Sequence, residues 1–349
     1  MTEVLHVDPA RPDTRQIARA AACLRAGGLV AFPTETVYGL GAHALDRAAV
    51  RRIFEAKDRP ANDPLIVHVS GIGDLPPLVT HVPDTARELA SHFWPGPLTL
   101  VLRRSSAVPD DVTAGLDTVA IRVPAHPVAG ALLEAARIPV AAPSANLFSR
   151  PSPTKAAHVL DDLEGRIDMV IDAGPTAHGI ESTVLDLTVD PPVVLRPGAV
   201  SLEQLRQILP AARFRDTAGL ASGPLPSPGL LTRHYAPRTP LSLYTGDAAA
   251  VRRALLADAH AALAAGQRVG VLGTREQLDS VRGLPAVVTD LGSDRDAPAI
   301  ASRLYAALRE LDAAGVDVIL AHDFTDQGGL WRALRDRLRR ASRQVIQAP

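Results

Sequence analysis

The chain has 349 residues, of which 46% are hydrophobic, and this length and composition suit two domains with a sizeable core in each. Its 37 lysines and arginines nearly cancel its 38 aspartates and glutamates, which argues against a broad electrostatic surface for nucleic acid or an anionic membrane but allows a local basic cleft. The single cysteine, Cys23, excludes an internal disulfide framework and a cysteine-rich metal site.

The first part of the chain alternates helical and strand-like segments. Its opening residues, MTEVLHVDPARPD, lack a secretion signal, and no apolar run approaches the roughly 18 residues of a membrane-spanning helix, so we expect a cytoplasmic protein with no membrane partner. Because strands 182–187 and 193–196 follow one another without a helix, we expect a mixed sheet in an α/β domain of residues 1–210. The pattern predicts strands at 29–32, 64–69, 98–102, 118–123, 138–142, 168–172, 182–187 and 193–196, and helices near 14–26, 46–56, 83–93, 126–136, 154–162 and 201–208.

The composition changes after this domain. Residues 216–240 contain five prolines and three glycines with little periodicity, and we expect a linker over 211–240. A regular alternation follows in residues 241–349, which predicts a small Rossmann-like domain with a doubly wound parallel sheet. Its predicted strands are 241–245, 268–272, 286–291 and 316–321, and its predicted helices are 247–265, 274–282, 296–313 and 329–342.

Two short pairs of polar residues, each two positions apart, are candidates for ligand binding. Pro60 favours an extended backbone at Arg59, and an extended chain would direct Lys57 and Arg59 toward one anion such as a polyphosphate. The alternative is that both only offset the dipole at a helix C-terminus. Ser144 and Asn146, after strand 138–142, could likewise present a hydroxyl and an amide to one ligand. The chain contains none of the standard phosphate-loop, dinucleotide or zinc-protease motifs.

Motifs along the whole chain resemble those of the threonylcarbamoyl-AMP synthase family in its two-domain form. They are, in order, PTETVYGLGA, KDRP, PLIVHV, WPGPLTLVL, AGLDTVAIRVPAHP, APSAN, RPSPT, ESTVLD, LRPGA and PGLLTRHYAP. The resemblance implies a YrdC-like catalytic domain with a twisted mixed sheet and helices, followed by the linker and the Rossmann-like domain. It also implies a nucleotidyltransferase that makes L-threonylcarbamoyl-adenylate and pyrophosphate from L-threonine, bicarbonate or CO2, and ATP with Mg²⁺.

The same resemblance implies the place of this reaction. The product feeds formation of N6-threonylcarbamoyl-adenosine in tRNA, and other proteins carry out the threonylcarbamoyl transfer. Since the net charge is near zero, direct binding of tRNA is expected to be weak. Because a carbamate is already anionic, the enzyme needs positioning and charge neutralisation more than a strong base.

Two groups of residues match the family's substrate contacts. Lys57 and Arg59 would be catalytic, and no metal ligand from the protein is expected. The nucleotide group is Lys57, Arg59, Asn62, Asp63, Thr118, Ser144, Asn146, Ser152, Arg196 and Tyr235, and the threonine group is Thr36, His68, Arg122, Ser182 and the backbone of Ala142.

Several of these residues also have a purely structural interpretation. Arg122 lies among strand hydrophobics and therefore needs an anionic partner. His68 could be an ordinary half-buried histidine, and Arg196 could only flank a turn. Tyr235 could either close over the nucleotide as part of a lid or anchor the linker by packing. Asp63 departs from the family pattern, which has Asn there, and would place a negative charge near phosphates unless it binds Mg²⁺ or points away.

Two other functions fit the YrdC-like fold. A double-stranded RNA-binding or ribosome-maturation module would use a concave cationic face, but the net charge and the 3% aromatic content argue against it. A carbamoyl-phosphate-using transferase of hydrogenase maturation would carry further regions for which this chain has neither the cysteines nor the length.

Overall fold

The computed structural model describes residues 1–215 and 233–348, so most of the linker predicted at 211–240 lies outside the described residues. The chain divides into two compact units. The first unit comprises Met1–Phe148 and Ser152–Leu230, and the second comprises Ser149–Pro151 and Leu231–Pro349.

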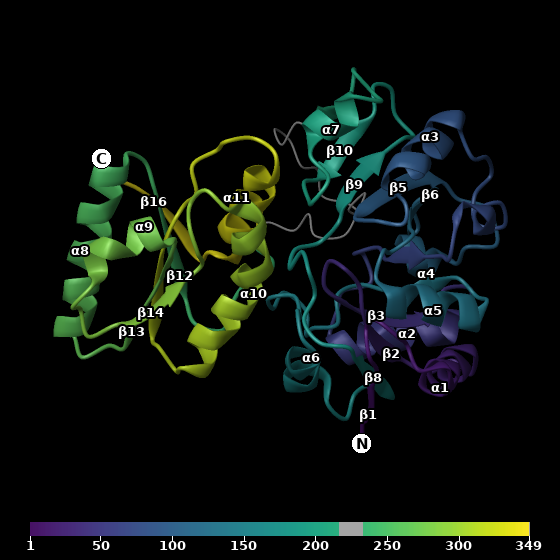
Figure 1. Cartoon of the computed structure of the whole chain (residues 1–349), viewed down its shortest axis with the longest axis horizontal. Helices are drawn as coiled ribbons and strands as arrows, with labels where there is room; N and C mark the ends of the chain where they lie inside the picture. Colours follow the sequence, from purple (N-terminus) through teal and green to yellow (C-terminus); the bar gives the residue numbers. More distant parts are fainter. Residues whose placement is uncertain (216–232, 349) are drawn as a thin grey trace. The chain divides into compact units, whose positions relative to one another are not determined.

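A mixed sheet is the framework of the first unit, as predicted. Within residues 1–215, eleven strands follow the order β1-β8-β2-β3-β7-β4-β6-β5-β9-β10-β11 (Figure 1). Strands β4 and β6 are parallel, whereas β9 and β10 are antiparallel, as expected for consecutive strands joined without a helix. The strands are Glu3–His6 (β1), Val30–Pro33 (β2), Tyr38–His43 (β3), Ile66–His68 (β4), Leu98–Arg103 (β5), Thr118–Arg122 (β6), Val140–Ala141 (β7), Met169–Asp172 (β8), Thr183–Asp186 (β9), Val193–Arg196 (β10) and Arg213–Phe214 (β11).

The helices of this unit begin and end at residues that suit helix termini. The Asp13 carboxylate accepts hydrogen bonds from the first-turn amides of α1, and Asp46 does the same for α2. Helix α2 ends at Lys57, because the next residue, Asp58, adopts a left-handed conformation with φ of 53°. The helices are Thr14–Arg25 (α1), Arg47–Lys57 (α2), Asp84–Phe93 (α3), Asp110–Thr113 (α4), Pro127–Ala136 (α5), Ala156–Leu163 (α6) and Leu202–Arg206 (α7), with a short 3-10 turn at Ile72–Asp74.

Strand β3 is not predicted from the sequence. The sequence Tyr38–His43 contains Gly39 and Gly41, and glycine lowers strand propensity. A Cβ atom on Gly41 would lie 2.9 Å from the Phe32 ring and 2.9 Å from Val140. The glycine therefore allows side chains of β2 and β7 to pack over the strand. The edge strands β1, β11 and β16 (Gln344–Gln347) are also not predicted from the sequence.

The second unit has the doubly wound parallel architecture that its sequence predicts. Five described strands follow the order β14-β13-β15-β12-β16 and pair in parallel. Helices α8 and α9 cover one face of this sheet and α10 and α11 cover the other (Figure 1). The helix predicted at 274–282 is shorter and changes to a 3-10 turn at Asp279–Val281. Its elements are Leu241–Thr245 (β12), Val269–Gly273 (β13), Val287–Asp290 (β14), Val318–His322 (β15), β16, Ala248–Ala264 (α8), Arg275–Leu278 (α9), Ala297–Ala313 (α10) and Leu330–Ala341 (α11).

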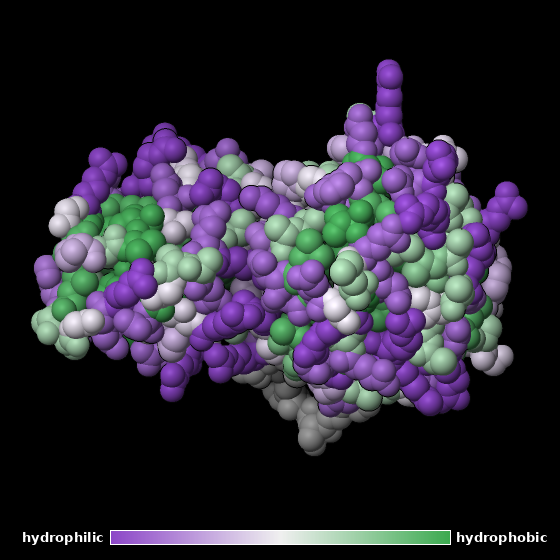
Figure 2. Space-filling model, turned by 90° about the horizontal axis from the view of Figure 1, so that it is seen from below, coloured by the Kyte–Doolittle hydropathy of each residue, from purple (hydrophilic) through white to green (hydrophobic). Residues whose placement is uncertain are grey.

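The surface in Figure 2 is mostly hydrophilic, with hydrophobic side chains in scattered patches. The large hydrophobic side chains that are exposed, among the described residues, are Met1, Leu45, Val189, Val287, Val288 and Val345. Within residues 1–215 and 233–348, no helix combines the length and apolar character required to cross a membrane.

Gly198 provides a test of the packing between β9 and β10. A Cβ atom there would lie 2.3 Å from the Thr183 amide nitrogen, so we expect Gly198→Ala to lower the free energy of unfolding of the first unit by about 1–3 kcal/mol or more. Gly130 is the matched control: it lies within α5 with open space around it, and Gly130→Ala should raise stability by up to about 1 kcal/mol.

Urea unfolding in a Trp331→Phe background checks both substitutions, because Trp94 then reports on the first unit alone. Equal effects of the two alanines would contradict the proposed close approach at Gly198.

Candidate functional site

The turn between β2 and β3 is organised by two threonine hydroxyls. Thr34 Oγ1 donates to the Val37 carbonyl at 2.7 Å and accepts from the amides of Thr36 and Val37, each at 3.2 Å. Thr36 Oγ1 lies 2.8 Å from Thr34 Oγ1. Since a hydroxyl has one proton to donate and that of Thr34 goes to Val37, the Thr36 hydroxyl is the donor of this pair. Its oxygen is therefore left as an acceptor for a third group.

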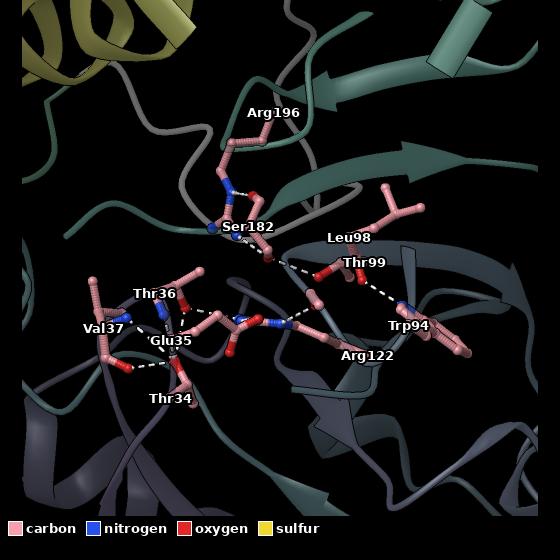
Figure 3. Close-up of polar contacts among 11 residues, drawn as sticks. Thr34, Glu35, Thr36, Val37, Trp94, Leu98, Thr99, Arg122, Ser182 and Arg196 are labelled. Atoms are coloured by element: carbon pink, nitrogen blue, oxygen red, sulfur yellow. Dashed lines mark hydrogen bonds and ion pairs between the residues drawn. The ribbon is translucent and has the colours of Figure 1, made fainter. Parts of the chain in front are cut away.

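That third group is Arg122, at the end of β6. Its guanidinium donates through Nη1 to Thr36 Oγ1 at 2.9 Å and through Nε to the Gly96 carbonyl at 3.2 Å. Its Nη2 lies 2.6 Å from Glu35 Oε1, and the side chains of Arg122 and Glu35 are only 4% and 9% exposed. Figure 3 shows the guanidinium directed at the 34–37 turn. A buried arginine on a strand is thus stabilised by an ion pair and two further hydrogen bonds.

Three histidines in this region are neutral. His68, on β4, is paired with Arg122 in the parallel ladder between β4 and β6, and its ring meets Phe32 edge-on. Burial, and then the positive charge of Arg122, lower the pKa of His68 to about 3. Burial also lowers the pKa values of His126 and His178, against the opposing effect of the Glu35 carboxylate. The charged groups of this cluster are therefore Arg122 and Glu35.

Ser182 connects β5 to Arg196 at the end of β10. Its hydroxyl lies 2.8 Å from Thr99 Oγ1 and accepts from Arg196 Nη2 at 3.1 Å, and its carbonyl accepts from Arg196 Nε at 3.1 Å (Figure 3). All three side chains are buried. The structure therefore links Ser182, predicted for threonine, directly to Arg196, predicted for the nucleotide.

Lys57 is held by the loop that carries the predicted Ser144 and Asn146. Its ammonium donates to the Ser144 carbonyl at 2.6 Å and to the Asn146 carbonyl at 2.5 Å, and the residue is 1% exposed. The backbone carbonyls, not the side chains, make these contacts. The expected extended chain from Lys57 to Arg59 is wrong, because Lys57 ends a helix and Asp58 is left-handed.

Arg59 pairs with Asp63. Its Nη2 lies 2.9 Å from Asp63 Oδ2, and the guanidinium also donates to the carbonyls of Asp63 and Pro64. Asp63 is completely buried, whereas Asn62 is exposed. Burial raises the pKa of the Asp63 carboxyl, while the charges of Arg59, Lys57 and Arg196 oppose that rise. Three cations predicted for the nucleotide thus act on one internal carboxylate.

The remaining predicted residues lie in separate surroundings. Ser152 is buried and donates to Glu181 Oε1 at 2.5 Å. The Ala142 amide donates to the Ile66 carbonyl, so a backbone contact from Ala142 to a ligand would come from its carbonyl oxygen.

Two further predicted residues, Thr118 and Tyr235, have no contact with the Arg122 cluster among the interactions described above. Thr118 begins β6 and therefore lies about 13 Å along the strand from Arg122 at 3.3 Å per residue. Tyr235 belongs to the second unit, where it stacks on Tyr305 at 5.4 Å and Arg337 lies over its ring. This packing matches the anchoring interpretation, and the ATP contact stays a prediction.

Three buried polar residues of this region are missed by the sequence analysis: Glu35, Thr99 and Glu181. A signal for Glu35 was available, because a buried arginine requires an anion and Glu35 adjoins Thr36. Within residues 1–215 and 233–348, no group of three or more His, Cys, Asp or Glu side chains could hold a metal ion.

The second unit has a cavity of about 410 Å³ at the C-terminal ends of β12, β13 and β15, where doubly wound sheets bind ligands. Its charged lining combines Arg252 and Arg335 with Glu276, Asp294, Asp323 and Asp326. None of the residues predicted for ATP or threonine lines it.

Comparison with known proteins gives a consistent result for both parts of the chain. Residues 22–198 match a model of the Sua5, YciO and YrdC proteins, described as telomere recombination, and residues 200–343 match the threonylcarbamoyl-AMP synthase C-terminal domain. The chain is 45% identical to a threonylcarbamoyl-AMP synthase of Pyrococcus abyssi over 98% of both chains. It is also 45% identical to one of Bacillus subtilis, over 94% of this chain and 93% of the relative. A crystal structure of P. abyssi Sua5 complexed with L-threonine is similar with a TM-score of 0.92, at 44% identity and 100% coverage of both chains.

The low pKa of His68 predicts how the stability of the first unit depends on pH. Above pH 6.5 the imidazole is neutral in the folded and the unfolded chain, but between pH 6.5 and about 3 only the unfolded chain binds the proton. Acidification to about pH 5 should therefore remove about 2 kcal/mol of stability through this residue, at 1.36 kcal/mol per pH unit.

Urea unfolding of the wild type and His68→Gln at about pH 7 and about pH 5 measures this contribution. We expect the variant to lose less stability between the two values, and the exposed His81→Gln control to follow the wild type. If His68→Gln and wild type lost the same amount, His68 would not be the neutral buried group described.

Proposed function

The chain belongs to the threonylcarbamoyl-AMP synthase family, and we propose that its first unit binds L-threonine and ATP in the cluster around Arg122, Ser182 and Arg196. As a member of this family it is a nucleotidyltransferase that forms threonylcarbamoyl-AMP for tRNA modification. The substrates of the reaction are L-threonine, bicarbonate or CO2, and ATP, and the second product is pyrophosphate.

The observation that supports the threonine site is the buried, oriented guanidinium of Arg122. A carboxylate is the group that such a fork binds best, and the adjacent Thr36 hydroxyl and neutral His68 offer hydrogen bonds to the rest of a small hydroxylated amino acid. Ser182 and the Ala142 carbonyl complete this proposed site. P. abyssi Sua5, which is 44% identical, has been crystallised with L-threonine.

The nucleotide half is proposed around three cations that act on Asp63: Lys57, Arg59 and Arg196. Phosphate oxygens gain negative charge as pyrophosphate leaves, so preoriented cations stabilise the transition state more than the ground state. We propose further nucleotide contacts from the other residues that match the family's nucleotide group. They are Asn62, Thr118, Ser144, Asn146, Ser152 and Tyr235.

The chemistry needs two bond-forming steps. The threonine amine attacks CO2 to form the carbamate, with loss of protons from nitrogen. A carbamate oxygen then attacks the α-phosphorus of ATP, and the bond from that phosphorus to the bridging oxygen of pyrophosphate breaks. The buried side chains are expected to contribute by positioning: they hold the carbamate next to the α-phosphate, so that the two groups react without a bimolecular encounter.

Magnesium is proposed to enter as Mg·ATP. The carboxylate of Asp63 pairs with Arg59, and that of Glu181 accepts from Ser152, so these two acids already have protein partners. Phosphate oxygens and water are therefore the proposed ligands of the ion, which prefers to keep several waters.

We further propose the domain roles outlined by the sequence: residues 1–210 for catalysis, 211–240 as a linker that reaches the nucleotide, and 241–349 as an accessory domain. The unstable adenylate would pass to separate threonylcarbamoyl-transfer proteins. Pyrophosphate release by the full chain, with threonine and bicarbonate added singly and together, tests the proposal, and release that ignores threonine would overturn it.

Substitution of Lys57 tests whether its positive charge contributes to catalysis in the nucleotide half. The same substitution at Lys155, the other lysine of the chain, is the control. Lys57→Met keeps an unbranched side chain one atom shorter than that of lysine and removes its charge. Loss of one charged contact to a developing phosphate charge should lower kcat by about 100- to 1,000-fold. Exposed Lys155→Met should keep wild-type turnover.

Because Lys57 also donates to two carbonyls, its removal will lower stability as well. Turnover is therefore measured below the unfolding midpoint of each variant, and per mole of protein that binds threonine. Unchanged kcat in Lys57→Met would exclude Lys57 from the nucleotide site.

Asp63→Asn tests whether the internal carboxylate competes with phosphates for the same cations. The amide keeps the shape of the side chain but removes the charge, so ATP should bind more tightly by about 3- to 10-fold, where tenfold corresponds to 1.4 kcal/mol. In the absence of ATP the variant should be less stable, because Arg59 loses its buried counterion.

The exposed Asp58→Asn is the matched control and should leave the Kd for Mg·ATP unchanged. Calorimetric titration with Mg·ATP and urea unfolding give both readouts. Weaker ATP binding by Asp63→Asn would instead indicate that Asp63 holds the magnesium ion of the nucleotide.

A further inference from the structure

Glu35 is a second charged group in the proposed threonine site, and it has no role in the function proposed above. Its Oε1 lies 2.6 Å from Arg122 Nη2, its side chain is 9% exposed, and both carboxylate oxygens are buried. Figure 3 shows the carboxylate beside the guanidinium and on the same turn as Thr36. Arg122 and Glu35 are thus opposite charges set side by side.

The Glu35 carboxylate is poorly satisfied by the protein. A carboxylate can accept about four hydrogen bonds, yet neither of its oxygens accepts one with normal geometry from the described residues, and the contact to Arg122 is an ion pair only. Buried polar oxygens without such bonds are rare in folded proteins. This carboxylate therefore has acceptor capacity for a cationic donor.

Within residues 1–215 and 233–348, Arg122 is the cation that forms an ion pair with Glu35. The Glu35 charge opposes the lowering of the pKa values of His126 and His178, but burial is the larger effect and keeps both histidines neutral near pH 7. The backbone of Glu35 is fixed, because its carbonyl accepts from the His178 amide at 2.8 Å. The carboxylate is thus held in place with Arg122 on one side.

We propose that Glu35 binds the α-ammonium group of L-threonine while Arg122 binds its α-carboxylate. The inference rests on the proposed function. The ammonium and the carboxylate of an α-amino acid are both bonded to its α-carbon, so the two charges are adjacent in space. The Glu35 carboxylate and the Arg122 guanidinium are also adjacent. Each substrate charge then meets the opposite protein charge, and the four charges alternate in sign.

This arrangement makes Glu35 a residue that selects for an amino group and positions the nucleophile. The amine is the atom that attacks CO2, so the contact to Glu35 fixes the reacting nitrogen relative to the rest of the site. A hydroxy acid of the same shape would leave the Glu35 carboxylate without its cation, and a buried site built for a polar partner rejects an analogue that lacks it.

Binding of three ligands to wild type and Glu35→Gln tests the proposal. The ligands are L-threonine, its analogue without the amine, 3-hydroxybutyrate, and its analogue without the carboxylate, L-threoninol. Loss of one charged contact should weaken L-threonine and L-threoninol by about 10- to 100-fold in Glu35→Gln. Binding of 3-hydroxybutyrate should be unchanged or tighter, because Arg122 no longer shares its charge with Glu35.

If Glu35 served only to orient Arg122, Glu35→Gln would weaken L-threonine and 3-hydroxybutyrate together and spare L-threoninol. That outcome, or equal binding of all three ligands to both proteins, would overturn the proposal. Wild-type protein that fails to bind L-threonine would instead contradict the proposed function, so the two failures are distinguishable.

Ligand-observed NMR titration measures the binding of the three ligands to each protein. The exposed Glu88→Gln is the control for an unrelated change of charge. Thermal unfolding establishes that each variant is folded. If Glu35→Gln does not fold, Glu35→Asp keeps the charge but withdraws it by one methylene. Glu35→Asp should then weaken binding of L-threonine and L-threoninol, by less than Glu35→Gln would. Unchanged binding of these two ligands would overturn the proposal.

Discussion

The buried guanidinium of Arg122 is the interaction on which the rest of the proposed site depends. A charge taken out of water at the end of a central strand is tolerated only if several partners surround it. Those partners are the Glu35 carboxylate, the Thr36 hydroxyl and the Gly96 carbonyl. Because the first two lie on the turn after β2, satisfying Arg122 also ties that turn to β6. The hydroxyl chain through Thr34 then fixes the directions in which the hydroxyls of Thr34 and Thr36 donate.

The nucleotide half follows the same electrostatic principle. Arg59 is paired with the fully buried Asp63, and the charges of Lys57 and Arg196 act on that same carboxylate. In both halves, then, a cation predicted to bind substrate already has a carboxylate of the protein beside it. A buried cation without such a partner would destabilise the fold by several kcal/mol. The internal carboxylates therefore allow cations to be buried and preoriented before any substrate charge reaches them.

Much of the fold was accessible from the sequence, because alternating apolar segments and helix-ending residues predict both the mixed sheet and the parallel sheet. The misses have physical causes. Strand β3 contains Gly39 and Gly41, whose low strand propensity is offset by close packing against Phe32 that only the folded chain shows. The site residues were identified by motif, but their partners were not. Pairing of Arg59 with Asp63 depends on how the chain turns after Asp58, and no local pattern specifies that turn.

The requirement for internal counterions also bears on affinity. A substrate carboxylate that binds Arg122 must do so beside Glu35, and phosphates that bind Arg59 must do so beside Asp63. The net gain from each new contact is therefore a difference between two ion pairs and is smaller than the contact alone suggests. The two halves differ in how the substrate can offset this repulsion. In the proposed site, an amino acid would bring its own cation to the carboxylate of Glu35, whereas a nucleotide would reach Asp63 with negative charge alone and would depend on the ion that it carries.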